Sequence, residues 1–318
     1  MAIDLSVLKY RKEITNMKSM TVILLILIGT LCNTAVNAET YDVTMEPSAV
    51  HNMSAFRLWT PQGVSRFRGI LMLNPGSNGD GREAVDDKYW QDFAAKHDFA
   101  LLATFLQDKP HPNMMIEDYI QVRNGSGEAI LGAIDHFANE SDHEELSYAP
   151  FLLWGMSAGG ELNHEIASWI PERVIAYVVN KGGYYYSSTP PEATRQTPGL
   201  YAIGLDDLPS RNTMIKGMYL TNRRAGALWT LAEEKGVAHE VADSRNLATS
   251  YYEAIMRMRM VDGALGYKAL KPVTEDMGVV GNIYTHNIGV EEGVRKEDTT
   301  WLPNEDFAKQ WLTHVTKD

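Results

Sequence analysis

The stretch that most constrains the fold is residues 151–167, which read FLLWGMSAGGELNHEIA. An apolar run ends in a G-x-S-x-G motif at residues 155–159, and a helical pattern follows without a gap. This order is typical of a nucleophile elbow, a sharp turn that presents Ser157 above a parallel sheet. Gly155 and Gly159 leave room for strand and helix to approach closely, and the first N–H groups of the helix point to where an oxyanion would form. The alternative interpretation is a glycine-rich turn with a solvated serine.

The first 38 residues have the pattern of a secretory signal. Four Lys and Arg residues precede an apolar run at 21–31, and the small residues at 35–38 provide a cleavage site. The apolar run is too short for a spanning helix, which needs about 20 residues. We therefore expect a secreted or periplasmic protein, cleaved after Ala38, with no stable membrane insertion afterwards. A retained N-terminal anchor is the alternative.

Charge and cysteine content exclude several classes of protein. The 318-residue chain has a formal net charge of −12 and no patch rich in Lys and Arg, which argues against a nucleic-acid or anionic-membrane partner. The signal holds four basic and two acidic residues, so the mature chain would be near −14. The single cysteine, Cys32, lies within the signal. The mature chain would then have no disulfide, no thiol nucleophile and no cysteine metal ligand.

Strand and helix patterns alternate from residue 69 to residue 259. Apolar runs predict buried strands at 69–73, 99–105, 151–156, 174–179 and 199–203, and helical spacing predicts helices at 86–97, 126–138, 158–170, 225–235 and 247–259. Two segments of alternating polarity, at 41–46 and 55–59, predict antiparallel strands ahead of them. Strand character at 278–288 and a final helix at 304–315 follow. The alternation indicates an α/β fold, a mostly parallel sheet with helices on both faces.

With this order and this motif, the chain resembles an α/β-hydrolase, closest to the secreted esterases of the dienelactone-hydrolase and polyhydroxyalkanoate-depolymerase-like branch. The resemblance covers about residues 41–260, and residues 154–160 are its most specific part. It implies an α/β-hydrolase catalytic domain at 39–260. Residues 261–318 have no counterpart in the common fold, and we expect them to form a C-terminal extension packed on the same domain.

A serine hydroxyl needs a base to activate it, and that base needs an acid to orient it. In the α/β-hydrolase fold, the order along the chain is Ser, then Asp or Glu, then His. Only three histidines lie late enough. His239 follows a short strand-like segment, where the fold exposes its base, and is favoured. His286 is the alternative, and His314, within the final helix, is interpreted as a surface residue.

The acid is expected directly after the strand at 199–203, where the chain reads Gly204-Leu205-Asp206-Asp207. Related hydrolases carry G-x-x-D at this place, which selects Asp207. Asp206 is the alternative, since a turn that differs by one residue would exchange the two roles. The remaining aspartate would be solvated and structural.

Two backbone donors are expected to stabilise the oxyanion. One is the N–H of Ala158, directly after the nucleophile, and the resemblance implies that the other is the N–H of Ser77. Related enzymes carry His-Gly-x where this chain has Pro75-Gly76-Ser77, so Asn74 and Asn78 are the side chains that could replace the hydrogen bonds of the absent histidine. The alternative, a phosphate-binding turn, lacks the Gly-Lys-Ser/Thr sequence.

Three consecutive tyrosines at 184–186 follow the strand at 174–179 and should border the pocket. Tyr184 and Tyr185 would form flat, amphipathic walls suited to an aromatic or sugar-linked ester, or they would pack the loop onto the body of the domain. The acidic run at 142–145 resembles a metal cluster in composition only, and no metal site is predicted.

The sequence therefore predicts an exported serine hydrolase that cleaves a carboxylic ester through an acyl-enzyme intermediate. Ser157 would attack, His239 would transfer the proton and Asp207 would orient His239, with no cofactor. The expected substrate is a small-molecule or polymer-linked ester. The alternatives are a serine peptidase of the prolyl-oligopeptidase-like kind and a binding protein with the α/β-hydrolase fold but without catalysis.

Overall fold

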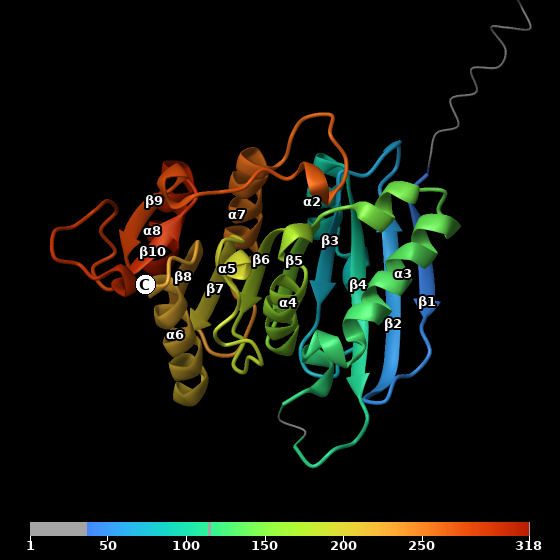
Figure 1. Ribbon diagram of the computed structural model, residues 1–318, viewed down its shortest axis with the longest axis horizontal. Helices are drawn as coiled ribbons and strands as arrows, with labels where there is room; N and C mark the ends of the chain where they lie inside the picture. The colour runs from blue at the N-terminus through green and yellow to red at the C-terminus, as the bar shows by residue number, and fades with distance from the viewer. Residues whose placement is uncertain (1–36, 114–115, 318) are drawn as a thin grey trace, which may run out of the picture. The chain divides into compact units, whose positions relative to one another are not determined.

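A central sheet of eight strands organises the computed structural model, which describes residues 37–113 and 116–317 (Figure 1). The strands are β1 (Glu39–Thr44), β2 (His51–Thr60), β3 (Gly69–Asn74), β4 (Phe99–Asp108), β5 (Phe151–Met156), β6 (Val174–Asn180), β7 (Gly199–Gly204) and β8 (Trp229–Glu234). Their spatial order is β1-β2-β4-β3-β5-β6-β7-β8. β2 pairs antiparallel with β1 and β4, whereas every pairing from β4 to β8 is parallel. The carboxyl ends of the parallel strands therefore meet at one edge of the sheet.

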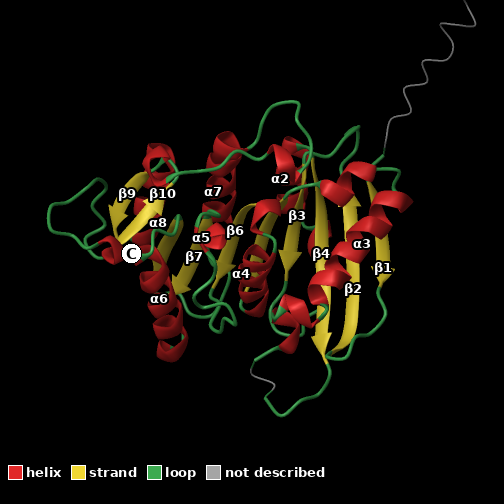
Figure 2. Ribbon diagram, viewed as in Figure 1, coloured by secondary structure: helices red, strands yellow, loops and turns green. Residues whose placement is uncertain are grey.

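Helices cover both faces of this sheet (Figure 2). One face packs against α3 (Ser126–Glu140), α4 (Ala158–Trp169) and α6 (Pro209–Arg224), and the other packs against α2 (Lys88–His97), α7 (Ser244–Arg259) and α8 (Glu305–Val315). The short helix α5 (Glu192–Arg195) lies in the connection from β6 to β7. The predicted α/β fold is confirmed.

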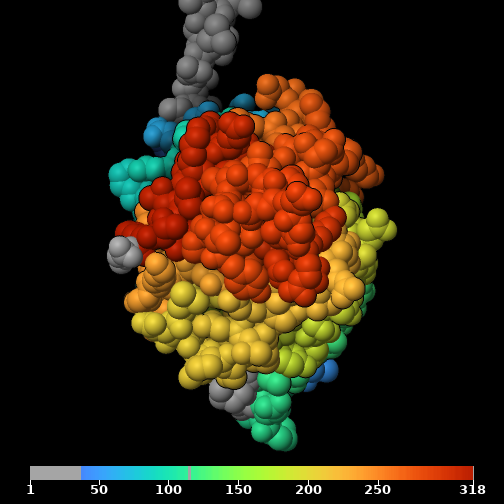
Figure 3. Space-filling model, turned by 90° about the vertical axis from the view of Figure 1, so that its left-hand side faces the viewer, coloured from blue at the N-terminus to red at the C-terminus, as the bar shows by residue number. Residues whose placement is uncertain are grey.

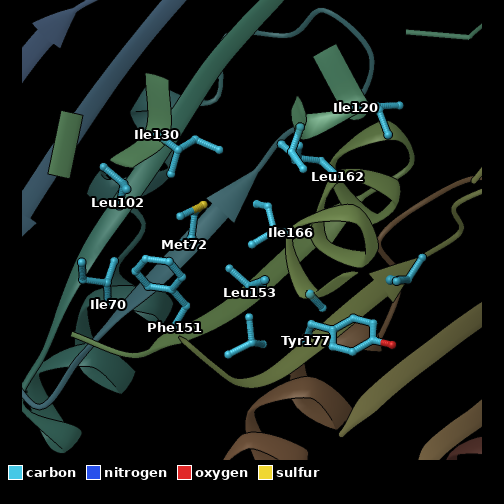
Figure 4. Packing of buried hydrophobic residues seen from close by; sticks show 14 of the residues in the cluster. Ile70, Met72, Leu102, Ile120, Ile130, Phe151, Leu153, Leu162, Ile166 and Tyr177 are labelled. Carbon is cyan, nitrogen blue, oxygen red and sulfur yellow. The ribbon is translucent and has the colours of Figure 1, made fainter. Parts of the chain in front are cut away.

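The core on the α3 and α4 side is built from the continuous apolar strands (Figure 4). Met72 of β3 and Leu153 of β5 are fully buried, and they belong to one cluster with Ile130 of α3 and with Leu162 and Ile166 of α4. Strands buried on both faces read as unbroken apolar runs, because every second residue also faces a layer of helices. This packing holds the start of α4, and with it the turn after β5, in place.

The prediction of a helix at 225–235 was wrong. The helix in this region is α6, which begins at Pro209 and ends at Arg224, and Trp229–Glu234 is strand β8. Leu, Ala and Glu in that segment favour helices, but Trp229 is fully buried and the strand pairs along its length with β7. Burial and pairing outweighed local helix propensity. His239 accordingly lies in the loop after β8 rather than after a separate short strand.

The C-terminal segment protects the β8 edge of the sheet. It contributes α8 and a two-stranded antiparallel sheet of β9 (Val279–Asn282) and β10 (Thr299–Leu302). Leu231 N–H donates to Thr300 Oγ1 at 2.9 Å, and the Trp311 indole N–H donates to Leu231 O at 2.7 Å. These contacts satisfy backbone groups that an open edge strand would expose. In Figure 3 the C-terminal segment spreads over this side of the molecule, next to α6.

The described residues from Ala38 onward form one compact unit. The predicted signal at 1–38 lies outside the described residues except for its last two positions. Within the described ranges, none of the helices is both long enough and apolar enough to cross a membrane.

Candidate active site

Ser157 occupies a sharp turn between β5 and α4. Its φ and ψ angles are 55° and −126°, a conformation that residues with a side chain rarely adopt. Two backbone hydrogen bonds hold Ser157 in this conformation. Ser157 N–H donates to Asn180 O at 2.8 Å, and Ser157 O accepts from Gly160 N–H at 2.8 Å. The serine is half-buried, so a strained backbone presents a side chain that is partly open to solvent.

Two glycines let three backbone segments meet at this turn. A Cβ atom at Gly155 would lie 2.3 Å from the carbonyl carbon of Gly159. One at Gly159 would lie 2.2 Å from Asn74 O, at the end of β3, and 2.4 Å from Pro75 O, in the loop that follows. No side chain fits at either position. The first turn of α4 therefore packs directly on the backbones of β5 and of the loop after β3.

The loop after β3 lies against the nucleophile. A Cβ atom at Gly76 would be 3.7 Å from Ser157 Cβ, an ordinary contact distance, and Ser77 follows as an exposed residue. Ala158 begins α4, where backbone N–H groups have no acceptor within the helix. Both predicted oxyanion donors, the N–H groups of Ala158 and Ser77, thus belong to segments that flank Ser157.

Asparagine side chains brace the loop after β3. Asn74 Nδ2 donates to Asn163 Oδ1 of α4 at 2.6 Å, and Asn74 Oδ1 accepts from Thr104 Oγ1 of β4 at 2.8 Å. Asn78 Oδ1 accepts from Asp108 N–H at 2.8 Å. Asn74 and Asn78 therefore supply the fixed hydrogen bonds that hold this loop. Asn163 could not be predicted from the sequence, because its partners are distant in the chain.

The acid and the base expected from the chain order lie together. His239 Nδ1 is 2.8 Å from Asp207 Oδ2, and the two residues follow the neighbouring strands β7 and β8. Asp207 is buried, with 6% of its surface exposed, whereas Asp206 is exposed and its backbone N–H donates to Val237 O. The geometry pairs His239 with Asp207 rather than with Asp206.

Arg211 joins this pair and was missed by sequence analysis. Its Nη1 lies 2.8 Å from Asp207 Oδ1 and 2.8 Å from His239 Nδ1. Arginine has no acceptor, so His239 Nδ1 can accept from Arg211 or donate to Asp207 Oδ2, but it cannot do both at once. The tautomer with a proton on Nδ1 is the one that bonds Asp207 Oδ2, and Arg211 then bonds only Asp207 Oδ1. That tautomer leaves His239 Nε2 unprotonated. The only sequence signal was the position of Arg211, one helical turn after Asp207.

Burial and hydrogen bonding act in opposite directions on Asp207. Burial alone would raise the pKa of its carboxyl group, but hydrogen bonds from His239 and from Leu208 N–H, together with the charge of Arg211, lower that pKa overall. Asp207 is therefore ionised at neutral pH and can stabilise a proton on His239.

His239 and Ser157 share one edge of the sheet but are not directly bonded. Ser157 follows β5 and His239 follows β8, both at the carboxyl ends of parallel strands. Among the described residues no hydrogen bond joins the two side chains, and about a third of the His239 side chain is exposed (34%). Catalytic hydrogen bonds are often longer in an enzyme without substrate than in its complex.

The other two late histidines lie in the C-terminal segment. The His286 ring contacts the edge of Trp311, with centroids 5.9 Å apart, and its backbone N–H donates to Asn282 O. His314 was interpreted as a surface residue, and this was wrong. It is buried, with Nε2 3.2 Å from Glu234 Oε1, because α8 packs against β8.

A buried ion pair links the ends of β6 and β8. The fully buried Lys181 donates from Nζ to Asn180 Oδ1 at 3.0 Å and to Glu234 Oε2. Burial would raise the pKa of Glu234, but His314 and Lys181 lower it overall, so the carboxylate is ionised. Glu234 O also accepts from Leu205 N–H at 2.9 Å, next to the aspartates. Asn180 also bonds the backbone of Ser157. The ion pair therefore connects Asn180 with the loop after β7 that carries Asp207.

The loop after β6 that carries Tyr184, Tyr185 and Tyr186, which we call the tyrosine loop, is held by buried polar side chains of α4. Glu161 Oε1 accepts from Tyr184 N–H at 3.0 Å. Tyr184 itself is half-exposed, whereas the Tyr185 side chain is buried and meets the edge of the His164 ring at a centroid distance of 5.0 Å. Of these two tyrosines, Tyr184 has the more accessible side chain.

Glu161 is a buried carboxyl group close to the nucleophile. It lies in the first turn of α4 and is 6% exposed. Burial raises its pKa to about 7, and the nearby charge of Glu117 adds to this, while the Tyr184 hydrogen bond and Arg211 act against it. Glu161 therefore changes protonation near neutral pH. In the parts of the chain that the structure describes, no group of three or more His, Cys, Asp and Glu residues could hold a metal ion.

Comparisons with known proteins support the fold through structure rather than sequence. No protein-family model and no curated protein matches the sequence. Poly(aspartic acid) hydrolase-1 from Sphingomonas sp. KT-1 is similar with a TM-score of 0.52 and 16% identity, over 69% of this chain and 99% of that one. LpqC, a poly(3-hydroxybutyrate) depolymerase from Bordetella parapertussis, is similar with a TM-score of 0.51 and 16% identity, over 71% of this chain and 93% of that one.

A third similar structure is the S-formylglutathione hydrolase from Agrobacterium tumefaciens, with a TM-score of 0.50 and 11% identity, over 71% of this chain and 97% of that one. At such identities the likeness concerns the fold. Together with the parallel sheet and the turn at Ser157, these matches show that the chain has the α/β-hydrolase fold.

The first prediction concerns the close backbone contact at the turn. Gly159→Ala should lower the free energy of unfolding by about 3 kcal/mol, because the added methyl group meets the backbone carbonyls of residues 74 and 75. Gly217→Ala is the matched control. A Cβ atom there has no neighbour within 4 Å, so this change within helix α6 should raise stability by about 0.5–1 kcal/mol. Urea unfolding measures both, and equal stabilities of the two variants would contradict the account.

The second prediction concerns Glu161. In the unfolded chain its carboxyl group ionises near pH 4.5, but in the folded protein only near pH 7, so stability falls as pH rises through this window. Glu161→Gln removes this loss. From pH 5 to pH 8 the variant should gain about 2–3 kcal/mol of unfolding free energy relative to wild type. The control is Glu172→Gln at an exposed position, and a parallel pH dependence in wild type and Glu161→Gln would exclude the assignment.

Proposed function

We propose that this protein is an exported serine hydrolase that cleaves a carboxylic ester with a Ser157–His239–Asp207 triad. The main support is the hydrogen bond of 2.8 Å between His239 and Asp207. The pair lies at the same sheet edge as the strained turn that carries Ser157. A buried acid, a base with a free ring nitrogen and an accessible hydroxyl group are the parts that acyl transfer needs.

In the proposed reaction, Ser157 Oγ attacks the ester carbonyl carbon while its proton moves to His239 Nε2. The negative charge on the carbonyl oxygen is held by the N–H groups of Ala158 and Ser77. His239 then returns the proton to the leaving alcohol as the ester C–O bond breaks, and an acyl-enzyme remains. Water attacks that acyl group with His239 again as base, which releases the acid and restores the serine hydroxyl.

The names of the similar structures describe hydrolases of acyl compounds. They include a poly(3-hydroxybutyrate) depolymerase and an S-formylglutathione hydrolase, and a poly(aspartic acid) hydrolase shares the fold. We infer a small-molecule or polymer-linked ester as the substrate. Export is proposed from the signal-like residues 1–38, with cleavage after Ala38 and a secreted or periplasmic location.

The third prediction tests the triad by kinetics with p-nitrophenyl acetate. Ser157→Ala and His239→Ala should each lower kcat by roughly 10⁴-fold or more, because the triad acts as a unit. Asp207→Asn should cost about 10⁴-fold, since the wrong His239 tautomer is then favoured. Asp206→Asn is the matched control and should stay within about threefold of wild type.

Two outcomes would overturn this function. Wild-type protein without esterase activity, or Ser157→Ala with undiminished activity, would exclude Ser157 as the nucleophile. A larger loss in Asp206→Asn than in Asp207→Asn would exclude the assigned acid. A parallel panel of peptide amides distinguishes an esterase from a peptidase, since hydrolysis of amides in preference to esters would contradict the proposed substrate class.

A further inference from the structure

A groove of 350 Å³ runs between the tyrosine loop and helix α6, and the proposed triad does not use it. Its volume is within the range of about 300–1,000 Å³ that is usual for ligand sites. The tyrosine loop contributes Gly183, Tyr184, Tyr185, Ser188 and Thr189, and α6 contributes Met214, Gly217, Met218 and Thr221. We call these nine residues the α6 groove.

One face of α6 forms the wall of the α6 groove. Met214, Gly217, Met218 and Thr221 are spaced by three, four and seven residues, so they lie on the same side of the helix. At a rise of 1.5 Å per residue, this wall is about 10 Å long. The groove therefore suits an elongated group rather than a compact one.

Gly217 keeps the α6 groove open, although no packing contact in the folded chain requires a glycine at this position. Glycine within a helix costs about 1 kcal/mol relative to alanine. A Cβ atom at Gly217 would have no neighbour within 4 Å, so nothing in the folded chain requires a glycine there. A larger residue would project into free space beside Met214 and Met218. The missing side chain leaves that space to a ligand.

The lining of the α6 groove selects an uncharged ligand. None of its nine residues is charged, although the whole chain has a formal net charge of −12. Met214 is 47% exposed, so its side chain is accessible to a ligand. Thioether and aromatic groups provide apolar contact, and Ser188, Thr189 and Thr221 provide hydroxyl groups. This chemistry fits a chain of methylene groups interrupted by neutral polar atoms.

One end of the α6 groove reaches the proposed triad. A Cβ atom at Gly183 would lie 3.2 Å from both Cγ and Nε of Arg211. Arg211 in turn is 2.8 Å from Asp207 and from His239. Leu208, which directly follows Asp207, is also exposed. A group held in the groove can thus be continuous with a group at the triad.

We propose that the α6 groove is a subsite for the uncharged, extended chain attached to the scissile ester. It holds this chain by apolar contact while the ester lies at Ser157. The inference rests on the proposed function, because the groove would bind the remote part of the same substrate. It adds a substrate class, namely esters of long neutral chains, and a specificity-determining position, Gly217.

The test compares p-nitrophenyl acetate with p-nitrophenyl octanoate. Wild type should have the higher kcat/KM for octanoate, by about tenfold, because burial of methylene groups stabilises its transition state. Gly217→Phe fills the groove and should lower kcat/KM for octanoate about tenfold, mainly by raising KM, while acetate stays within about twofold. Met214→Ser removes apolar contact from an exposed position and should raise KM for octanoate alone, about threefold.

Thr213→Phe is the control, since Thr213 is exposed on the same helix but does not line the groove. Thr213→Phe should leave kcat/KM unchanged for both substrates. Thermal unfolding should show that all variants are folded. Equal kcat/KM for the two wild-type substrates, or equal losses for both substrates in Gly217→Phe and Met214→Ser, would overturn the subsite. If the subsite fails but acetate hydrolysis still depends on Ser157, the proposed function stands. Absence of all Ser157-dependent hydrolysis overturns both the subsite and the proposed function.

Discussion

The contact on which the candidate site depends is the one between three backbones at Ser157. Helix α4 begins directly on Asn74 O and Pro75 O because Gly159 has no side chain, and β5 approaches it because Gly155 has none. This contact brings the first N–H groups of α4, the loop after β3 and the serine into one place. A single methyl group at either glycine would separate them, and no rearrangement of side chains alone could restore the distance.

Buried polar groups fix the remaining parts around that contact. Asn163 ties α4 to the loop after β3, and Glu161 ties the same helix to the tyrosine loop. Lys181 and Glu234 join the ends of β6 and β8, and His314 brings the C-terminal helix into the same cluster. Buried charges cost free energy unless they are paired, so these pairs resist displacement. The C-terminal segment thus supports the site while also covering the β8 edge.

Much of this arrangement could be predicted from local pattern. The strand, turn and helix around Ser157 and the alternation from residue 69 onward follow from runs and spacings of apolar residues, which depend on near neighbours in the chain. The segment at 225–235 failed because its helix formers are overruled by burial of Trp229 and pairing with β7. Arg211, Asn163 and the burial of His314 could not be predicted, because each depends on a partner that only the fold brings near.

The central claim is that the turn at Ser157 presents an activated nucleophile. The most direct measurement is reaction of the folded protein with a fluorophosphonate, followed by peptide mass spectrometry to locate the adduct. We expect one phosphonyl group per chain, on the peptide that contains Ser157, and no labelling after urea unfolding. An adduct on any other residue, or an unlabelled folded protein, would contradict it.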